Sequence, residues 1–578
     1  MPFSRIRRCP LPVWHRRDGD ATGIDAPKMV SNRIAEERKR KGRSMGKPTK
    51  KGSRNRKALQ KAQQAAARDL VAVSHAASDP INHYAQFRHR QRRFILHVGP
   101  TNSGKTHDAL QTLKDYDSGI YLAPLRLLAL EVGERLRSSG FACDIITGEE
   151  RSLEQGARYS SRTVEMVDLE HPYACAVIDE AQMVADDRRG GAWTRAILGI
   201  DAAEVHVCMA PEALDIVMTL IALCGDEASV IRHERMTPLS VERNPLDGDC
   251  EPGDALIAFD RREVLSKAAS IEERGIPTAV IYGALPWPAR RAEAERFASG
   301  EAKVLVATDA VGMGLNLPIR RVVFTAVSKY DGRRNRPLTA SEVRQIAGRA
   351  GRLGMFDHGY VTSTCDENDW LREKLEAVVP PITSARLPFP RELGEDAEVP
   401  LSIVLKAWSK SPLRFDMMRR VNLRGPITIA SMLERRGAGT GQGIASSRRT
   451  LLKMAFLPVD ENRDLDEVNG LYQGLKRKRH PMLPGGEIWE RQYDRENHDL
   501  AQLERMVRTL SIRFAFARTI GLLNETLEAR FAEERIRLER QVIAKVTGPK
   551  APLIEDRLTT DFLDSEGNDG SVTGVWRF

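Results

Sequence analysis

The stretch HVGPTNSGKTHDAL, residues 97–110, has the spacing of a loop that binds nucleotide phosphates. Its two glycines permit a backbone turn that directs N–H groups toward phosphate oxygens, and its lysine supplies a positive charge for the β- and γ-phosphates. The threonine offers a hydroxyl ligand for Mg²⁺. An apolar run precedes the loop and a helical stretch follows it, as such a loop requires. We therefore predict an ATP-binding loop made of Gly99, Pro100, Thr101, Asn102, Ser103, Gly104, Lys105 and Thr106.

Two adjacent carboxylates end a second apolar run, CAVIDEAQM at residues 175–183. Asp179 is suited to hold Mg²⁺ together with Thr106, and Glu180 is suited to orient and deprotonate an attacking water. In isolation the pair would also fit a surface acid pair at the end of a strand. Its position downstream of a phosphate loop favours the catalytic interpretation.

A third polar set lies in LTASEVRQIAGRAGRLG, residues 338–354, which opens with a helix-capping box. On a helix with about 100° per residue, Gln345, Arg349 and Arg352 would share an arc of roughly 60°. The glycines between them indicate close approach of another surface. The alternative is an exposed basic helix. We predict that all three act in catalysis with Glu180, the two arginines as arginine fingers for the ATP phosphates.

These groups need two sheets to position them. Short apolar runs alternate with helical stretches, which predicts parallel sheets covered by helices on both faces. The runs of the first unit are residues 94–98, 119–123, 143–147, 175–179 and 205–209. The runs of the second unit are residues 255–259, 279–282, 304–308 and 321–325. Because each unit carries part of the ATP chemistry, hydrolysis would require the two units to close on one nucleotide and would move one relative to the other.

The predicted fold class is α/β: two tandem RecA-like doubly wound parallel-sheet domains, then an α-helical C-terminal domain, with a disordered basic N-terminal arm. The Pro-, Asp- and Gly-rich stretch 244–254 is interpreted as the linker between the sheets. The predicted segments are a basic arm at 1–92, RecA-like domains at 93–244 and 245–375, a helical domain at 376–546 and a flexible tail at 547–578.

The net charge of +10 is unevenly distributed. Residues 1–93 hold 24 Lys and Arg against 7 Asp and Glu, and residues 38–57 hold eleven basic residues and no acidic one. This basic run predicts either a tether for nucleic acid, which releases counterions from phosphates, or a solubilising tail. A short helix is expected near residues 56–72. No apolar run approaches the roughly 20 residues needed to cross a bilayer, so we expect no membrane partner.

The chain resembles the superfamily-two helicases, and more narrowly the family of the mitochondrial degradosome RNA helicase (the Suv-three type) and its bacterial relatives. The motifs that carry the resemblance are GPTNSGKT 99–106, APLRLLALEVGERL 123–136, TGEE 147–150, TVEM 163–166, VIDEAQM 177–183, RGGAWTRAILG 189–199, VIYGALP 280–286, VATDAVGMGLNLPIRRVVF 306–324 and QIAGRAGR 345–352. A weaker resemblance continues through MAFLPVD 454–460 and residues 499–517. The segment VCMAPEAL, 207–214, departs from the glycine–glutamate core of the family's third motif.

The resemblance implies an ATP-dependent RNA helicase with 3′-to-5′ polarity that uses ATP and Mg²⁺ and acts in RNA degradation or surveillance beside an exoribonuclease. Its nucleic-acid partner would be RNA, single-stranded and duplex. Asp309 and Gly312 would couple RNA contact to the ATP cleft. The RNA-binding residues implied are Pro124, Leu125, Arg126, Thr147, Gly148, Thr163 and Thr308. We expect a bacterial cytoplasmic location, with a mitochondrial one as the alternative.

Two other functions remain open at this point. A DNA helicase or duplex translocase would use the same motifs, because phosphate contacts are common to both polymers. A non-catalytic RNA-binding scaffold is the second alternative, and the complete set of ATP-site residues argues against it.

Overall fold

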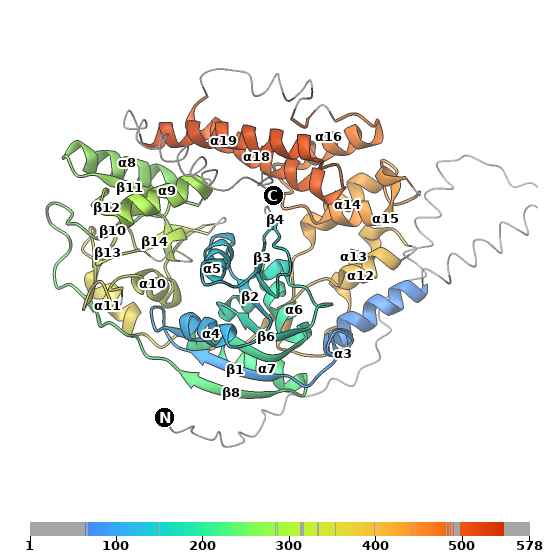
Figure 1. The fold of residues 1–578 in the computed structure, drawn as a ribbon, viewed down its shortest axis with the longest axis horizontal. Helices are drawn as coiled ribbons and strands as arrows, with labels where there is room; N and C mark the ends of the chain where they lie inside the picture. Colours follow the sequence, from blue (N-terminus) through green and yellow to red (C-terminus); the bar gives the residue numbers. More distant parts are fainter. Residues whose placement is uncertain are drawn as a thin grey trace, which may run out of the picture.

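Two sheet domains and a helical region lie side by side, with helices α18 and α19 running above both sheets in the view of Figure 1. In this computed structural model the structure describes residue 64 and residues 67–547, except 149–150, 284, 286, 313–316, 332–333, 353, 398, 442, 481, 485, 487–488 and 490–497. The predicted basic run 38–57 and all but the first residue of the predicted tail lie outside the described residues. Within the described part, no helix is both long and apolar enough to span a membrane.

The first domain is built on an eight-stranded sheet with the order β4-β3-β5-β2-β6-β7-β1-β8. All neighbouring strands are parallel except β3 and β4. The strands are β1 (Arg93–Val98), β2 (Gly119–Ala123), β3 (Cys143–Ile146), β4 (Arg151–Ser152), β5 (Tyr159–Thr163), β6 (Tyr173–Ile178), β7 (Ala202–Met209) and β8 (Glu227–Arg232). The helices are α4 (Lys105–Lys114) and α5 (Arg126–Ser138) on one face, and α6 (Gly191–Gly199) and α7 (Leu214–Leu223) on the other.

Burial on both faces explains why most of these strands are continuous apolar runs. Along β7, Val205 and Val207 pack toward α6 and α7, and Cys208 packs with the residues of α4 and α5. Strand β5 is the exception, because its sequence YSSRT is polar. Its Ser161 hydroxyl donates to the carbonyl oxygen of Ala129 in α5 at 2.6 Å, which satisfies the buried group.

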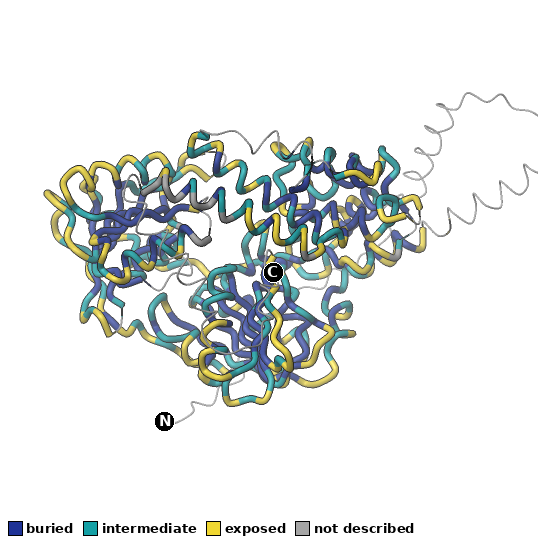
Figure 2. The backbone as a smooth tube through the Cα atoms, turned by 45° about the horizontal axis from the view of Figure 1, so that its top comes forward, coloured by how far each residue is buried: buried dark blue, intermediate teal, exposed yellow. Residues whose placement is uncertain are grey.

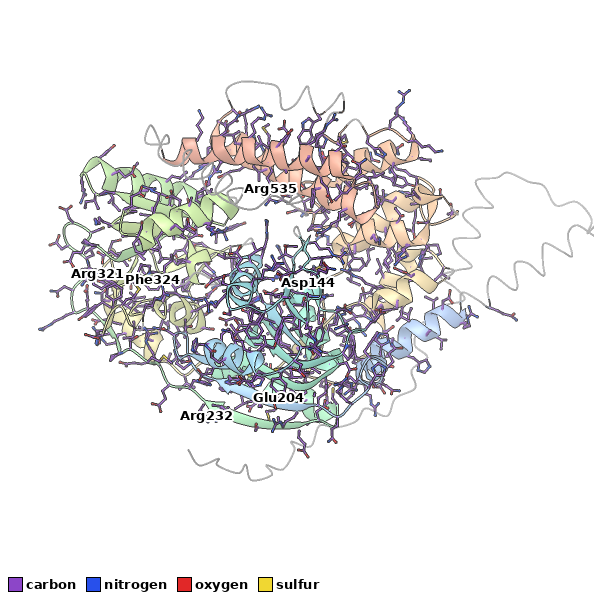
Figure 3. The ribbon with its side chains drawn as sticks, in the orientation of Figure 1. Asp144, Glu204, Arg232, Arg321, Phe324 and Arg535 are labelled. Carbon is purple, nitrogen blue, oxygen red and sulfur yellow. The ribbon has the colours of Figure 1, made fainter. Side chains whose placement is uncertain are left out.

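The second domain has a parallel six-stranded sheet with the order β11-β12-β10-β13-β16-β9. The strands are β9 (Leu239–Val241), β10 (Asp254–Ile257), β11 (Thr278–Ile281), β12 (Val304–Ala307), β13 (Arg321–Phe324) and β16 (Gly359–Ser363). The covering helices are α8 (Arg261–Glu273), α9 (Trp287–Ala298), α10 (Ala340–Ala347) and α11 (Asn368–Glu376). Arg321 of β13, labelled in Figure 3, links this strand to β10. Its guanidinium donates to the buried carboxylate of Asp254 at 2.6 and 2.9 Å.

The expected fold class is confirmed, and each of the nine predicted apolar runs overlaps a strand. Strand β9 lies on the first-domain side of our boundary at residue 244, yet it pairs with β16 in the second sheet. The stretch 244–254 also lies inside the second domain, because the Leu246 N–H donates to the Ser363 carbonyl oxygen at 2.8 Å. The chain therefore crosses between the sheets earlier, through residues 233–238, which we call the crossover.

Part of the predicted arm is folded onto the first domain. Residues 67–78 are helical and are followed by α3 (Pro80–Ala85). The expected helix at 56–72 is therefore confirmed for its described residues, 64 and 67–72, and the rest of it lies outside the described residues. Leu70, Val73 and Tyr84 are buried in the main core. The expectation of disorder through residue 92 is therefore wrong for the described residues of this segment. The helix at 67–78 carries one basic and one acidic residue, Arg68 and Asp69, and its spaced apolar side chains pack into the core.

The helical region also contains two short strands. Its helices are α12 (Arg391–Asp396), α13 (Leu401–Lys410), α14 (Arg424–Glu434), α15 (Arg448–Ala455), α16 (Leu465–Lys476), α18 (Leu500–Thr519) and α19 (Glu525–Thr547). The strands β17 (Ala385–Leu387) and β18 (Met418–Arg420) are parallel and pair with each other. Figure 2 shows buried segments running through all three parts of the molecule. Buried residues of the helical region belong to the same apolar cluster as residues of both sheets.

We predict that Arg92 is essential for the stability of the first domain. Its fully buried guanidinium donates to the Asp226 carboxylate and to the carbonyl oxygens of Ile197 and Ile200. The change Arg92→Ala removes the closest partner of the buried Asp226, which keeps only the more distant Arg88 at 3.7 Å, and should lower the free energy of unfolding by about 3 kcal/mol. Chemical denaturation measures this loss. The exposed Arg158→Ala variant should change stability by less than about 0.5 kcal/mol, and equal effects of the two would contradict the prediction.

Candidate active site

The phosphate loop joins β1 to α4 through two left-handed residues. Asn102 has φ 61° and Gly104, the residue before α4, has φ 80°. A side chain at Gly99 would collide with the carbonyl oxygen of His233, 2.3 Å from the position of its Cβ atom. This position therefore requires glycine. The loop ends on the N-terminus of α4, where free N–H groups and the helix dipole favour phosphate.

The side chain of Lys105 folds back onto the first residues of the phosphate loop. Its ammonium group donates to the carbonyl oxygens of Gly99 at 2.7 Å and Pro100 at 2.5 Å. Burial lowers the pKa of Lys105, and the carboxylates of Glu180 and Asp179 partly oppose this effect. Because the ammonium group lies in a buried site of low dielectric, its attraction to a phosphate group is strong.

Asp179 and Thr106 offer the oxygen atoms that Mg²⁺ prefers. The Thr106 hydroxyl donates to the Asp179 carboxylate at 3.0 Å, and the Tyr121 hydroxyl donates to its other oxygen at 2.9 Å. Burial, together with the charge of Glu180, raises the pKa of Asp179. A buried carboxylate beside a hydroxyl at the start of a phosphate-binding helix suits Mg²⁺ coordination.

Glu180 adopts a left-handed conformation with φ 52°, which is uncommon outside glycine. The Gln182 amide N–H₂ donates to its carboxylate, and the Gln182 carbonyl accepts from the Ala210 N–H at 3.1 Å. Gln182 therefore links the carboxylate to the segment after β7. That segment reaches the second domain, since the Ser341 hydroxyl donates to the Glu212 carboxylate at 3.2 Å.

The arginines come from the second domain, but not from one helix face. The capping box at Thr339 is present, yet α10 ends at Ala347 and a turn follows. Of the three expected residues only Gln345 lies on the helix, so the predicted shared arc with Arg349 and Arg352 is wrong. Gly348 ends the helix, and glycine there is a poor helix former.

The turn Gly348–Gly351, which we call the arginine turn, lies directly on the phosphate loop. A Cβ atom at Gly348 would stand 2.7 Å from Cβ of Thr101, which confirms the expected close approach. The carbonyl oxygen of Gly351 accepts from the Asn102 amide at 2.7 Å. Burial lowers the pKa of Arg349, and the charges of Glu180 and Asp179 oppose this effect, so its guanidinium lies near both carboxylates.

The remaining residues expected at the ATP cleft lie in the second domain. Asp309 and Gly312 bound a short 3₁₀ helix that follows β12. The Asp309 carboxylate pairs with the Lys329 ammonium at 2.7 Å, and Lys329 also pairs with Glu342 of the capping box at 2.9 Å. These two ion pairs connect Asp309 to α10 rather than to the phosphate loop. Thr308, implied to bind RNA, is buried at the end of β12.

The residues implied to bind RNA follow adjacent strands of the first sheet. Pro124, Leu125 and Arg126 follow β2, Thr147 and Gly148 follow β3, and Thr163 ends β5. The ATP residues follow β1 and β6. Because β3, β5 and β2 are neighbours, one half of the sheet edge carries the implied RNA residues and the other half the ATP residues. Burial lowers the pKa of Arg290 in α9, and the positive charge of Arg126 adds to this effect, so two cations from different domains interact here.

Sequence reasoning missed the polar residues that connect these groups. Arg235 and Thr237 in the crossover both donate to carbonyl oxygens of the arginine turn. Arg189 donates to the Pro124 carbonyl, and the Trp193 indole donates to the Asp179 carbonyl at 2.8 Å. The segment RGGAWTR offered little signal, because Trp193 is also a fully buried residue of the main core and its type alone does not mark a role in the site. The crossover offered none, since it was assigned to the first domain.

The two sheet domains each match a known family of helicase domains. Residues 80–233 match the family model of the DEXQ-box helicase domain of Suv3, and residues 249–354 match the helicase conserved C-terminal domain. The resemblance to Suv3-type helicases is thereby confirmed for the two sheet domains.

Three known proteins show how far the similarity extends. The chain is 44% identical over 323 residues to the human mitochondrial ATP-dependent RNA helicase SUPV3L1, covering 53% of this chain and 41% of that protein. It is 46% identical over 289 residues to the mitochondrial DExH-box ATP-dependent RNA helicase DExH16 of Arabidopsis thaliana, covering 49% and 51%. The Escherichia coli DEAH/RHA helicase HrpB is similar at 19% identity and a TM-score of 0.45, over 73% of this chain and 58% of that chain. The chain thus spans about half or less of these curated relatives.

We predict that Gly348→Ala slows ATP turnover by hindering domain closure. The added methyl group would press on Thr101 and on the Arg344 carbonyl oxygen, each 2.7 Å away, and would displace the arginine turn. A misplacement of about 1 Å should lower kcat about 10²-fold. Steady-state ATPase measurements test this. Gly443→Ala in the helical region is the control, because its Cβ position has no neighbour within 4 Å, and it should leave kcat unchanged. Normal turnover in the Gly348 variant would contradict the prediction.

Proposed function

We propose that the protein is an ATP-dependent RNA helicase that moves along RNA from 3′ to 5′. The observation that carries the proposal is the arginine turn, which lies on the phosphate loop and brings Arg349 near Glu180. Such an arrangement makes one ATP site from two domains, so nucleotide turnover and relative domain movement are linked. The two relatives described above, both ATP-dependent RNA helicases, support the same activity here.

Each residue of the cleft has a distinct task in hydrolysis. Lys105 binds the β- and γ-phosphates, and Thr106 and Asp179 would hold Mg²⁺, which neutralises charge on the phosphates when bound. Glu180 orients the attacking water and accepts its proton. Arg349 stabilises the charge that develops on the transferred phosphoryl group, and Gln345 and Arg352 extend the same cleft from the second domain. Asp309 and Gly312 couple the cleft to Thr308.

RNA would cross the other half of the sheet edge. There, Pro124, Leu125, Thr147 and Thr163 follow neighbouring strands. Arg126 and Arg290 bring positive charge from both domains, which suits a phosphate backbone. We further propose that the protein acts in RNA degradation with an exoribonuclease as partner. Both of these relatives are mitochondrial proteins, which favours the mitochondrial alternative over our expectation of a bacterial cytoplasm.

We predict that Glu180→Gln separates ATP binding from hydrolysis. The variant keeps the size and shape of the side chain but loses the base, so kcat should fall by about 10²–10⁴-fold. Binding of a non-hydrolysable ATP analogue should be retained, because Lys105 and the loop are intact. The exposed Glu170→Gln variant is the matched control and should hydrolyse ATP normally. A Glu180 variant with normal turnover would remove Glu180 from the mechanism.

We predict unwinding of a 3′-tailed RNA duplex with ATP and none of a 5′-tailed one. Strand displacement on matched RNA and DNA duplexes measures both polarity and polymer preference. Unwinding of DNA with RNA left intact would favour the DNA helicase alternative. RNA binding by the wild-type protein without any RNA-stimulated ATPase would favour the scaffold, and Lys105→Ala supplies the inactive reference.

A further inference from the structure

Arg235 lies in the crossover, where the chain passes from the first sheet to the second. The crossover is held to the first domain by the His233 N–H, which donates to the Val98 carbonyl oxygen at 2.8 Å. It is held to the second domain at its other end, since the Gly359 N–H donates to the Pro238 carbonyl oxygen at 2.9 Å. Arg235 is thus tethered to both domains by the backbone on either side of it.

The Arg235 guanidinium bonds to the two sides of the ATP cleft at once. One terminal nitrogen, Nη1, donates to the Thr101 carbonyl of the phosphate loop at 3.2 Å and to the Gly348 carbonyl of the arginine turn at 2.8 Å. The other, Nη2, donates to the Ala350 carbonyl. The Nε atom donates to the Thr237 carbonyl at 2.8 Å, which fixes the orientation of the planar group.

All of these acceptors are neutral backbone oxygens. Within the described part of the chain, no carboxylate bonds to or pairs with this guanidinium. Burial lowers the pKa of Arg235 to about 10, so the side chain stays charged at neutral pH. A half-buried cation without a counter-ion is favourable only where several carbonyl dipoles point at it. The arginine turn and the phosphate loop supply these dipoles only when they lie together.

Neighbouring side chains complete the same contact. The Thr237 hydroxyl and the Asn102 amide both donate to the Gly351 carbonyl, the latter at 2.7 Å. The carbonyls of Gly348, Ala350 and Gly351 are therefore all bonded to the crossover or to the phosphate loop. The residue enclosed by these bonded positions is Arg349, the proposed arginine finger.

We propose that Arg235 is a positioning residue, which fixes the arginine turn to the phosphate loop and thereby sets where Arg349 stands during ATP hydrolysis. The proposal rests on the proposed ATPase function. It also implies that a bound nucleotide can influence the position of Arg349, because the Thr101 carbonyl belongs to the loop that would hold the phosphates. A displacement of that loop changes one acceptor of Arg235, and the other acceptors move with the turn.

The geometry requires arginine rather than a positive charge alone. A guanidinium offers donors on three nitrogen atoms in a fixed plane, and here each nitrogen serves a different carbonyl set. A lysine ammonium has one nitrogen and cannot reach Thr237, Gly348 and Ala350 from the same position. Arg235→Lys therefore keeps the positive charge but loses the planar set of three donor nitrogens, whereas Arg235→Met removes both.

The experiment compares Arg235→Lys and Arg235→Met with Arg232→Met in the full chain. Arg232 is exposed at the end of the edge strand β8 and provides a matched control three residues away (Figure 3). The readouts are kcat and KM for RNA-stimulated ATPase, the Kd of a non-hydrolysable ATP analogue, and fluorescence transfer between labels on the two domains with that analogue. The thermal midpoint of each variant reports its folding.

We expect both Arg235 variants to lose about 10²-fold in kcat and to show reduced closure of the domains with the analogue. The analogue's Kd should change less than about threefold, because its contacts with Lys105 remain. The Arg232 variant should match the wild type. Rescue of kcat by lysine, or wild-type closure and turnover in both variants, would overturn the proposal.

Two further outcomes concern a destabilised variant and an inactive wild type. If Arg235→Met lowers the thermal midpoint strongly, Arg235→Lys and Thr237→Val carry the test, since Thr237→Val removes only one bond to the turn. Normal turnover in both of these would overturn the proposal. If the wild type shows no RNA-stimulated ATPase, the proposed function fails. The closure signal with the analogue still decides whether Arg235 fixes the turn.

Discussion

The hydrogen bonds between the arginine turn and the phosphate loop determine what every other part of the site can do. Lys105, Thr106, Asp179 and Glu180 stand on the first sheet, and Arg349 stands on the second. Neutral hydrogen bonds are individually worth only about 0.5–1.5 kcal/mol net, and bonds to a charged group about 1.5–3 kcal/mol, so such a contact can open and close. The site therefore exists as a whole only in the closed arrangement, and a nucleotide that binds both walls favours that arrangement.

The segment that opens α6 connects the two halves of the first sheet edge. Its Trp193 indole donates to the Asp179 carbonyl, and its Arg189 side chain donates to the Pro124 carbonyl. The Arg189 guanidinium also lies over the Trp193 ring at 5.4 Å. Strands β2 and β6 are neighbours, so a short rigid path joins the carboxylate pair to the loop implied to contact RNA. A shift of one loop changes the support of the other, which provides physical coupling without a long chain of contacts.

The sequence was informative where the residues of one short segment are enough to determine its local structure. The phosphate loop, the carboxylate pair and nine strands follow from glycine placement and from apolar runs between two helical layers. The polar β5 could not be predicted, because Ser161 is satisfied by the Ala129 carbonyl, a partner known only from the packing of α5. The turn at Gly348 was misjudged, since capping and spacing favoured one continuous helix. Arg235 escaped notice because its acceptors come from the phosphate loop and the arginine turn.

The helical region limits how the two sheets can separate. Glu504 of α18 accepts from the Tyr282 hydroxyl at 2.8 Å and pairs with Arg261, both in the second domain. At its other end, Arg518 donates to the Gly148 carbonyl of the first domain. The Glu504 group joins a charge-assisted pair to a hydroxyl bond, and its side chain is only 8% exposed, whereas the Arg518 bond ends on a neutral carbonyl at the surface. Both contacts involve a guanidinium, but the Glu504 pair carries opposite charges on its two partners and lies largely away from water, which strengthens it. Opening of the cleft would therefore break the Arg518–Gly148 bond before the Glu504 contacts, which releases the loop after β3 while α18 stays with the second domain.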